Sequence, residues 1–212
     1  MGRRVLVKVC GITAVVDGVK AAEAGADAIG LVFWERSPRA VSLDEARRIA
    51  AALPPFVTRV GVFVDADRGF IARAAESVGL DVVQLHGDET VEACRSAPRR
   101  VMKAVRVGRG FESGAALRYR DAAAGVLLDT RDDGGMPGGT GRAFDWSLAR
   151  RLRAELPFLG LAGGLTAASV ADAIRQVDPD LVDVSSGVES SPGHKDHEKV
   201  RAFIEAVRSV ER

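Results

Sequence analysis

The sequence predicts a single α/β domain over residues 1–212, folded as an eight-stranded (β/α)8 TIM barrel. Short runs rich in Val, Leu and Ile recur with helical patterns between most of them, beginning near residues 5, 27, 58, 81, 101, 124, 158 and 181. Runs such as residues 59–64 do not alternate between apolar and polar residues, so both faces of the strand must be buried. Parallel strands joined by crossover helices are buried in this way. The length of 212 residues also lies close to the roughly 200 with which this barrel can be built.

The helix after residue 42 is predicted by its ends and by its apolar spacing. Apolar residues recur at helical intervals from Ala46 to Leu53, so one face of this segment can pack on a core. Ser42 and Glu45 have the spacing of a capping box. A proline pair at 54–55 cannot continue the helix and ends it.

One long irregular segment is expected after the sixth strand. The run 126–128 leads into Asp129, and a glycine-rich stretch, residues 130–142, follows directly. A loop of this length beside an acid predicts a functional segment, and the alternative is a tolerated surface insertion. The next helix is predicted to begin at Asp145, whose carboxylate can cap it, and to stop at Pro157.

Composition excludes several classes of protein. Thirty basic and 29 acidic side chains leave a net charge of +1, too balanced for binding nucleic acid or a membrane surface by bulk charge. No apolar run reaches the roughly 20 residues of a membrane span, and no signal-peptide pattern is present, so a cytoplasmic protein is expected. Cys10 and Cys94 are then expected to remain thiols. A monomer is the default expectation, with a homodimer as the alternative.

Three ionisable residues stand where predicted strands end. Cys10 follows the first run, Asp129 the sixth and Asp183 lies in the eighth. In a closed parallel barrel the carboxyl ends of all strands meet at one face, so these side chains can share one site. Their pattern is not that of a metal site, and their expected convergence on one face predicts an enzyme.

Glycine-rich turns after the last two strands predict a phosphate site. Gly163 and Gly164 follow the seventh strand, and Ser186 and Gly187 follow the eighth. In eight-stranded barrels this pair of loops commonly binds phosphate through exposed backbone N–H groups. The alternative is that these glycines only make tight turns.

A series of motifs runs in order from Lys8 to the last helix. The motifs are Lys8-Val9-Cys10-Gly11-Ile12-Thr13, Gly30-Leu31-Val32-Phe33, Ser37-Pro38-Arg39, Val60-Gly61-Val62-Phe63, Val83-Gln84-Leu85-His86-Gly87, Leu127-Leu128-Asp129, Gly138-Gly139-Thr140-Gly141, Phe144-Asp145-Trp146, Gly163-Gly164-Leu165, and Asp183-Val184-Ser185-Ser186-Gly187-Val188-Glu189 with Pro192-Gly193 and Lys195-Asp196. Together they resemble the phosphoribosylanthranilate isomerases of tryptophan biosynthesis. Their number and order set this resemblance apart from a single-motif match.

The resemblance implies a cofactor-free rearrangement of a phosphorylated sugar carrying anthranilate into an open-chain aminoketose phosphate. Asp129 matches the family's general acid, which protonates the ring oxygen of the sugar. Cys10 matches the base that removes the proton from the second sugar carbon. Arg39 matches the residue that binds the anthranilate carboxylate, and Asp183 matches a binding position. His86 ends the fourth run and is either in contact with substrate or structural.

The two proposed catalytic groups start in the wrong protonation states. A free thiol is mostly neutral at pH 7 and a free carboxyl is mostly ionised. Burial would raise the pKa of Asp129 as required, but it would also raise that of Cys10. The hypothesis is therefore that backbone N–H groups at the barrel mouth, helped by Lys8 or His86, favour the Cys10 thiolate.

Three other functions fit parts of the pattern. A histidine-pathway aminoaldose isomerase would need a second glycine-rich phosphate loop, which the third and fourth strand ends lack. A metal-dependent epimerase would need several histidines at strand ends, and only His86 lies at one, whereas His194 and His197 are expected on a solvated surface. A non-catalytic sugar-phosphate binder would not require both Cys10 and Asp129. Cys94 is expected to be structural.

Overall fold

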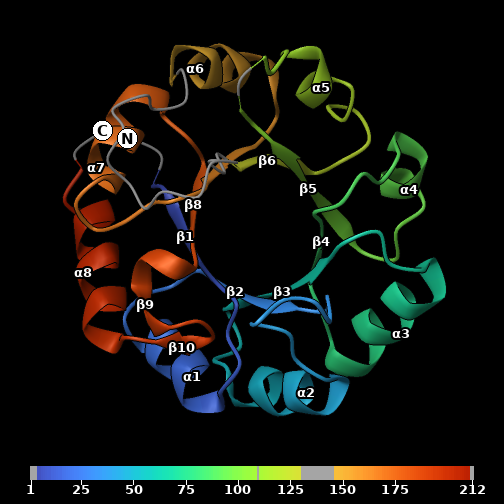
Figure 1. Ribbon diagram of the computed structural model, residues 1–212, viewed down its shortest axis with the longest axis vertical. Helices are drawn as coiled ribbons and strands as arrows, with labels where there is room; N and C mark the ends of the chain where they lie inside the picture. The colour runs from blue at the N-terminus through green and yellow to red at the C-terminus, as the bar shows by residue number, and fades with distance from the viewer. Residues whose placement is uncertain (1–3, 109, 130–145, 211–212) are drawn as a thin grey trace.

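Eight parallel strands form a closed barrel surrounded by helices (Figure 1). This computed structural model describes residues 4–108, 110–129 and 146–210. The strands are β1 (Leu6–Cys10), β2 (Ala28–Val32), β3 (Thr58–Phe63), β4 (Val82–Leu85), β5 (Arg100–Arg106), β6 (Gly125–Asp129), β7 (Leu159–Ala162) and β8 (Leu181–Val184). The helices are α1 (Val15–Glu23), α2 (Leu43–Ala52), α3 (Arg68–Val78), α4 (Val91–Arg95), α5 (Gly114–Leu117), α6 (Trp146–Glu155), α7 (Val170–Val177) and α8 (His197–Arg208).

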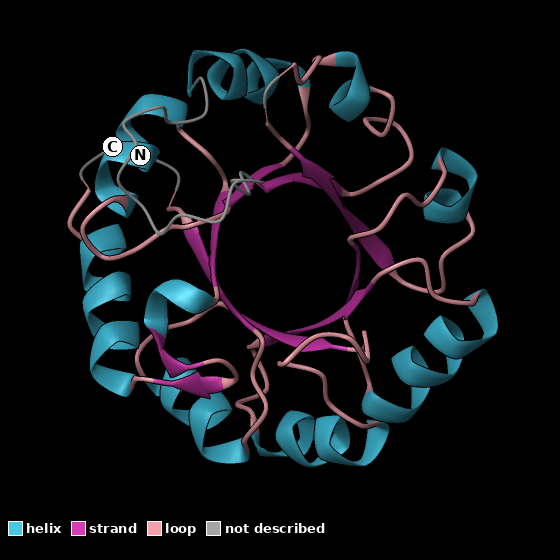
Figure 2. Cartoon of the chain, in the orientation of Figure 1, coloured by secondary structure: helices cyan, strands magenta, loops and turns pink. Residues whose placement is uncertain are grey.

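The barrel closes by parallel pairing of β1 with β8. Leu6 lies opposite Leu181 and Val9 opposite Val184 across this seam. The other neighbouring strands also pair in parallel and in sequence order, so the strands form one continuous ring (Figure 2). The predicted barrel is confirmed, and each predicted strand run contains one of the eight barrel strands.

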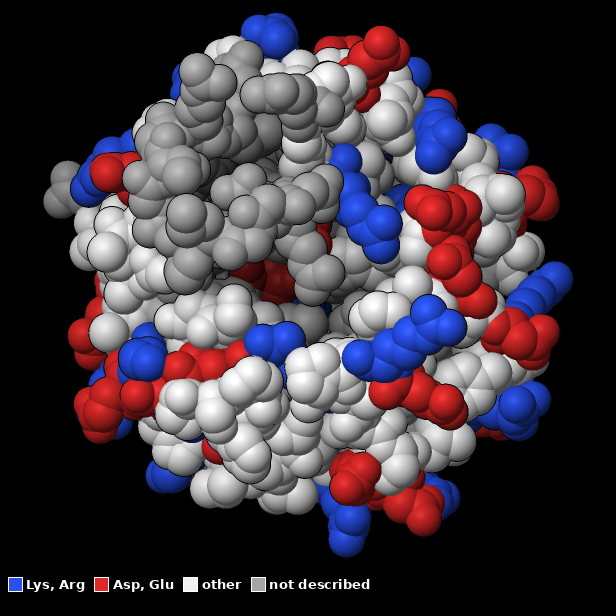
Figure 3. Space-filling view, in the orientation of Figure 1, with Lys and Arg blue, Asp and Glu red and all other residues white. Residues whose placement is uncertain are grey.

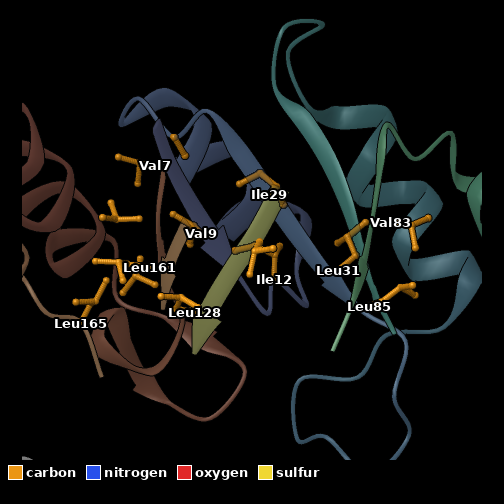
Figure 4. Close-up of a cluster of buried hydrophobic side chains, with 14 of the residues drawn as sticks. Val7, Val9, Ile12, Ile29, Leu31, Val83, Leu85, Leu128, Leu161 and Leu165 are labelled. Atoms are coloured by element: carbon orange, nitrogen blue, oxygen red, sulfur yellow. The ribbon is translucent and has the colours of Figure 1, made fainter. Parts of the chain in front are cut away.

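The apolar core has two parts. The larger part includes side chains such as Val9, Leu128 and Leu161, several of which are drawn in Figure 4. A smaller cluster consists of Ala104, Leu127, Ala162 and Leu181. Strands of a barrel point alternate side chains inward and outward, which is why neighbours such as Leu127 and Leu128 belong to different clusters.

Local signals at the helix ends agree with the sequence. Ser42 accepts a hydrogen bond from the backbone N–H of Glu45, and the Glu45 carboxylate accepts one from the Ser42 N–H, so the predicted capping box is confirmed. Helix α2 ends at Ala52, just before the proline pair. Helix α3 ends at Val78 and is capped by Gly79, which has a φ of 70° in the left-handed region that glycine tolerates.

Some features lie outside the predictions or outside the described residues. A short hairpin, β9 (Glu189–Ser191) with β10 (His194–Lys195), follows the 3₁₀ helix η1 (Ser186–Val188) and was not predicted. The loop 130–142 and the cap at Asp145 lie outside the described residues. Among the described residues, no helix is long and apolar enough to cross a membrane.

Replacing Ser42 by alanine should lower stability without changing the barrel. The change removes the side-chain bond to the Glu45 N–H and should cost about 1 kcal/mol. For a chain of this size, thermal denaturation should show a fall in Tm of about 2–4 °C. Ser113→Ala is the matched control, because Ser113 precedes α5 without a side-chain capping bond. Equal shifts in the two variants would contradict the role of the capping box.

Candidate active site

A cavity of about 240 Å³ lies at the carboxyl ends of the strands. The hollow at the centre of Figure 3 has acidic surface inside it and basic side chains around it. The structure places all the site residues predicted from the sequence along this cavity: Cys10, Arg39, His86, Asp129, Gly163, Gly164, Asp183, Ser186 and Gly187. Residues that are far apart in the sequence, from Cys10 to Gly187, therefore share one small site.

Cys10 is the last residue of β1 and lies next to a buried ion pair. Its backbone pairs with Gly30 of β2, where a Cβ would lie only 2.8 Å from the Cys10 sulfur, so glycine makes room for the thiol. Lys8 points to the same side of β1, because side chains two residues apart on a strand share a face. The Lys8 Nζ donates to Asp183 Oδ2 at 2.8 Å, and both side chains are buried.

The surroundings of Cys10 do not favour its thiolate in this structure. Burial raises the pKa of Cys10, the Lys8 ammonium lowers it and the Asp183 carboxylate raises it again, with a net upward direction. The expectation of a thiol poised toward its thiolate is therefore wrong, because desolvation of the buried sulfur outweighs the neighbouring cation. Lys8 nevertheless lowers the pKa of the Cys10 thiol, as expected.

Lys8 itself remains a cation. Burial lowers the pKa of Lys8, but Asp183 and Cys10 raise it, and the net direction is upward. Burial also raises the pKa of Asp183, with Lys8 opposing. One ammonium group thus faces two groups that can be anions. The second carboxylate oxygen of Asp183, Oδ1, is buried without a hydrogen-bond partner among the described residues.

Asp129 ends β6 and contacts His86. His86 Nε2 lies 2.9 Å from Asp129 Oδ2, and the other ring nitrogen, Nδ1, lies 2.9 Å from Gln84 Nε2. The Asp129 side chain is 9% exposed and that of His86 23%. A ring nitrogen facing a carboxyl group can share or exchange a proton with it, so His86 is placed to influence the protonation of Asp129.

Arg39 is held by a buried carboxylate. Its Nε and one Nη donate to the two oxygens of Glu189, at 2.8 and 2.6 Å, in a forked pair. The Lys195 Nζ also donates to Glu189 Oε1, at 2.8 Å. Burial would raise the pKa of Glu189, but hydrogen bonds from Arg39 and Lys195 outweigh it and lower the pKa. Glu189 is therefore a carboxylate that fixes the orientation of the Arg39 guanidinium.

The glycine-rich loops after β7 and β8 touch each other. Gly163 and Gly164 have φ values of 94° and 65°, in the left-handed region. A Cβ on Gly187 would lie 2.0 Å from the Leu165 carbonyl oxygen, so only glycine fits there. The Ser185 hydroxyl lines the same cavity and is buried without a partner among the described residues. This end of the cavity offers backbone and hydroxyl groups to a polar ligand.

The opposite part of the cavity is apolar. Val32 and Trp34 come from the end of β2 and the loop after it, and Val62 and Val64 come from the neighbouring β3 and its end. Arg39 lies in the same loop as Trp34, between β2 and α2. The cavity thus combines an apolar wall and a guanidinium in one part with glycine loops in another, which suits a ligand with an apolar, anionic group at one end and a polar group at the other.

Three charged residues of the site were not singled out as site residues from the sequence. Glu189 and Lys195 fall in matched motifs, but no local pattern indicates that their side chains are buried against Arg39. Arg106 ends β5, is exposed and lines the cavity. The rule that selected Asp129, a charged residue closing an apolar strand, would also have found Arg106.

Cys94 and His194 lie as expected, whereas His197 is only partly exposed and contacts a buried carboxylate. Cys94 is buried in α4. His194 is exposed in β10, and His197 begins α8 with its Nε2 2.8 Å from Asp17 Oδ1. Within the described part of the chain, no group of three or more His, Cys, Asp or Glu side chains could hold a metal ion.

Fold and cavity together define a class of protein, the (β/α)8-barrel enzymes that act at the carboxyl ends of their strands. Within this class, the chain belongs to the N-(5'-phosphoribosyl)anthranilate (PRA) isomerase family, whose family model matches residues 7–206. An N-(5'-phosphoribosyl)anthranilate isomerase of Pseudomonas fluorescens (strain Pf0-1) is 55% identical over 201 residues, which are 95% of this chain and 97% of that protein.

Solved structures agree with this assignment. The crystal structure of phosphoribosyl anthranilate isomerase from Thermotoga maritima has a TM-score of 0.89 and 46% identity, covering 96% of this chain and 98% of that one. A second isomerase structure, in complex with reduced 1-(o-carboxyphenylamino)-1-deoxyribulose 5-phosphate, has a TM-score of 0.87 and 44% identity, with coverage of 96% and 98%. The family expected from the motifs is confirmed.

Removing the charge of Lys8 should move the titration of Cys10 to higher pH. Lys8 lowers the pKa of the thiol, so Lys8→Met should raise it. The measurement is the rate of alkylation by iodoacetamide against pH, in a Cys94→Ala background where Cys10 is the remaining cysteine. Lys20→Met, which alters an exposed lysine paired with Glu23, is the control. An unchanged or lower midpoint for Lys8→Met would show that this cation does not act on the thiol.

Proposed function

We propose that the protein converts N-(5-phosphoribosyl)anthranilate into 1-(2-carboxyphenylamino)-1-deoxyribulose 5-phosphate, an Amadori-type rearrangement in tryptophan biosynthesis. The reaction is inferred from the family to which the chain belongs. The observation that carries the proposal is that Cys10 and Asp129, from strands β1 and β6, line one cavity with the glycine loops after β7 and β8. A thiol, a carboxyl group and an anion site are what this chemistry requires.

The first step needs an acid. Asp129 gives a proton to the furanose ring oxygen, the bond from that oxygen to the first sugar carbon breaks, and the anthranilate nitrogen, which keeps its hydrogen, uses its lone pair to form a protonated imine with that carbon. His86 contacts the same carboxyl group through its Nε2 and holds it in place. The burial of Asp129 keeps water away from this proton, so the transfer is directed to the sugar.

The second step needs a base. The imine acidifies the hydrogen on the second sugar carbon, and the Cys10 thiolate removes it to give an enolamine. Tautomerisation then adds a proton to the first carbon and takes one from the hydroxyl of the second, which leaves the ketone. The protein regains its starting state when the thiol loses a proton and the Asp129 carboxylate takes one up. Because burial disfavours the thiolate, Lys8 is the cation that makes it accessible.

Binding of the two ends of the substrate follows from the charges of the cavity. Glu189 occupies two of the five N–H groups of Arg39, so the remaining groups can donate to the anthranilate carboxylate. Trp34 and the valines beside it provide the apolar surface for the aromatic ring. The phosphate goes to Gly163, Gly164, Ser186 and Gly187, where backbone N–H groups can bind it without a basic side chain. Asp183 Oδ1 and Ser185 Oγ are left for the sugar hydroxyls.

The expected location and assembly state complete the proposal. The net charge of +1 gives no bulk attraction to nucleic acid or to a membrane surface, and the small cavity fits a small phosphorylated sugar. The protein is therefore proposed to be a cytoplasmic enzyme that binds neither nucleic acid nor membranes. The chain is proposed to be one domain and a monomer, with a homodimer as the alternative. Sedimentation at several protein concentrations distinguishes the two assembly states.

Turnover should require both proposed proton-transfer groups. The fluorescence of freshly generated phosphoribosylanthranilate should decay faster than spontaneous hydrolysis when the protein is added, with the aminoketose identified by mass. Cys10→Ala and Asp129→Asn should each lower kcat by about 10²-fold or more, because each removes one acid or base. Cys94→Ala is the control and should keep activity. No conversion by the folded wild type would favour a rival substrate or a binding protein, and full activity of Cys10→Ala would place the base elsewhere.

Loss of Arg39 should affect binding more than chemistry. Arg39→Ala removes a charge-assisted hydrogen bond to the substrate carboxylate and should raise KM about tenfold or more, with a smaller change in kcat. Steady-state kinetics over a range of substrate concentrations measure both constants. Arg47→Ala, at an exposed arginine of α2, is the control. A fall in kcat with KM unchanged would assign Arg39 to the chemical steps instead.

A further inference from the structure

A buried ion pair with no assigned role lies next to the candidate site. Lys103 Nζ contacts Glu89 Oε2 at 3.0 Å, and the two side chains are only 2% and 7% exposed. Lys103 belongs to β5, and Glu89 lies in the loop between β4 and α4. Neither residue lines the cavity. Moving two charges out of water is unfavourable, and an apolar pair of similar volume is often as stable or more so. Stability alone therefore does not explain this pair.

Besides a bond to the Ala104 carbonyl oxygen at 2.8 Å in its own strand, Lys103 contacts the segment around His86. Its Nζ donates to the carbonyl oxygen of Leu85 at 3.2 Å and to that of Gly87 at 2.8 Å, so it bonds the residues on both sides of His86. The backbone N–H of His86 donates to Phe63 O at 2.8 Å. The backbone that carries the imidazole is therefore fixed from β5 and from β3.

Glu89 completes this anchorage from the loop. Its carboxylate accepts from the Gly87 N–H, at 3.0 and 2.9 Å to its two oxygens, and from the Asp65 N–H at 3.0 Å. Its own carbonyl oxygen accepts the Tyr119 hydroxyl at 2.8 Å. Glu89 thus joins the ends of β3 and β4 through one buried carboxylate.

The segments after β3 and β4 pack closely against each other through Asp65 and Gly87. Asp65 has a φ of 46°, which is unusual for a residue other than glycine. Its Oδ1 accepts the Asp88 N–H at 2.7 Å, and a Cβ on Gly87 would lie 2.3 Å from the same oxygen. A strained residue held in place by its surroundings is typical of a functional region.

We propose that the Glu89–Lys103 ion pair positions His86 against the Asp129 carboxyl group. The proposal rests on the proposed function, in which Asp129 is the acid. The His86 side chain is 23% exposed, and among the described residues its ring nitrogens hydrogen-bond Gln84 and Asp129. Its place beside Asp129 therefore depends on the backbone that bears it. Glu89 and Lys103 are positioning residues and do not touch the substrate.

The test compares Glu89→Gln with a matched ion pair at the other end of the barrel. Asp180 is also buried, pairs with Arg153 at 2.9 Å and accepts the Leu159 N–H at 2.8 Å, but it lies where β7 and β8 begin. Both Glu89→Gln and Asp180→Asn should lower Tm. Only Glu89→Gln should lower kcat, by about tenfold, with KM nearly unchanged. The reason is that a displaced His86 no longer holds the Asp129 carboxyl group in place, and small displacements of catalytic groups lower the rate by at least this factor. It should also change the pH profile of kcat and the ¹⁵N shifts of His86.

A double-mutant cycle shows whether Glu89 acts through His86. In a His86→Ala background, Glu89→Gln should reduce kcat no further, because the group it positions is gone. If Glu89→Gln does not fold, Glu89→Asp keeps the charge, shortens the reach and should give a smaller loss in kcat. Normal kcat in folded Glu89→Gln or Glu89→Asp would overturn the proposal, as would an equal further loss in the His86→Ala background.

The outcome can be separated from that for the proposed function. Wild-type turnover and its loss in Asp129→Asn test the reaction, whereas the ¹⁵N shifts of His86 in Glu89→Gln are measured without substrate. Unchanged His86 shifts with an active wild type would remove the positioning role and leave the reaction standing. Changed shifts with an inactive wild type would keep the positioning of His86 and remove the reaction.

Discussion

The parallel pairing of β1 with β8 closes the barrel, and both the fold and the site depend on it. An open sheet would leave one row of backbone N–H and C=O groups unpaired, and closure removes that edge. Lys8 and Asp183 are Cα partners across this seam, and their side chains meet at 2.8 Å. Cys10 and Ser185 each follow two residues later on the same face. The register that completes the barrel therefore also assembles one side of the cavity.

Three buried lysine–carboxylate pairs lie near the candidate site, although such pairs add little to stability. Each of three buried lysines has a carboxylate partner, in the pairs Lys8–Asp183, Lys103–Glu89 and Lys195–Glu189. The desolvation of such pairs cancels much of their attraction, so the apolar clusters around and within the barrel must supply most of the folding free energy. These pairs fix the positions of their side chains, because a buried charge is favourable only next to its partner.

The sequence predicted what is local or repeated. Strands, the capping box at Ser42 and the strand-end positions of Cys10 and Asp129 follow from periodicity and spacing, and the closed barrel then brings the strand ends together. The contact between Arg39 and Glu189 could not be predicted in this way, because it joins residues 150 positions apart. The direction of the Cys10 pKa shift also needed the structure, since burial and charge act in opposite senses.

Cys10 and Asp183 compete for the same ammonium group. Burial raises the pKa of both, and Lys8 opposes the rise in both. With Asp183 ionised and bonded to Lys8, a second anion on Cys10 meets a cation that is already neutralised. Any hydrogen bond that a ligand hydroxyl donates to Asp183 Oδ1, which is buried without a partner among the described residues, draws negative charge away from Lys8. The ammonium would then have more of its field left for a thiolate, so a hydrogen bond donated to Asp183 and ionisation of Cys10 would favour each other.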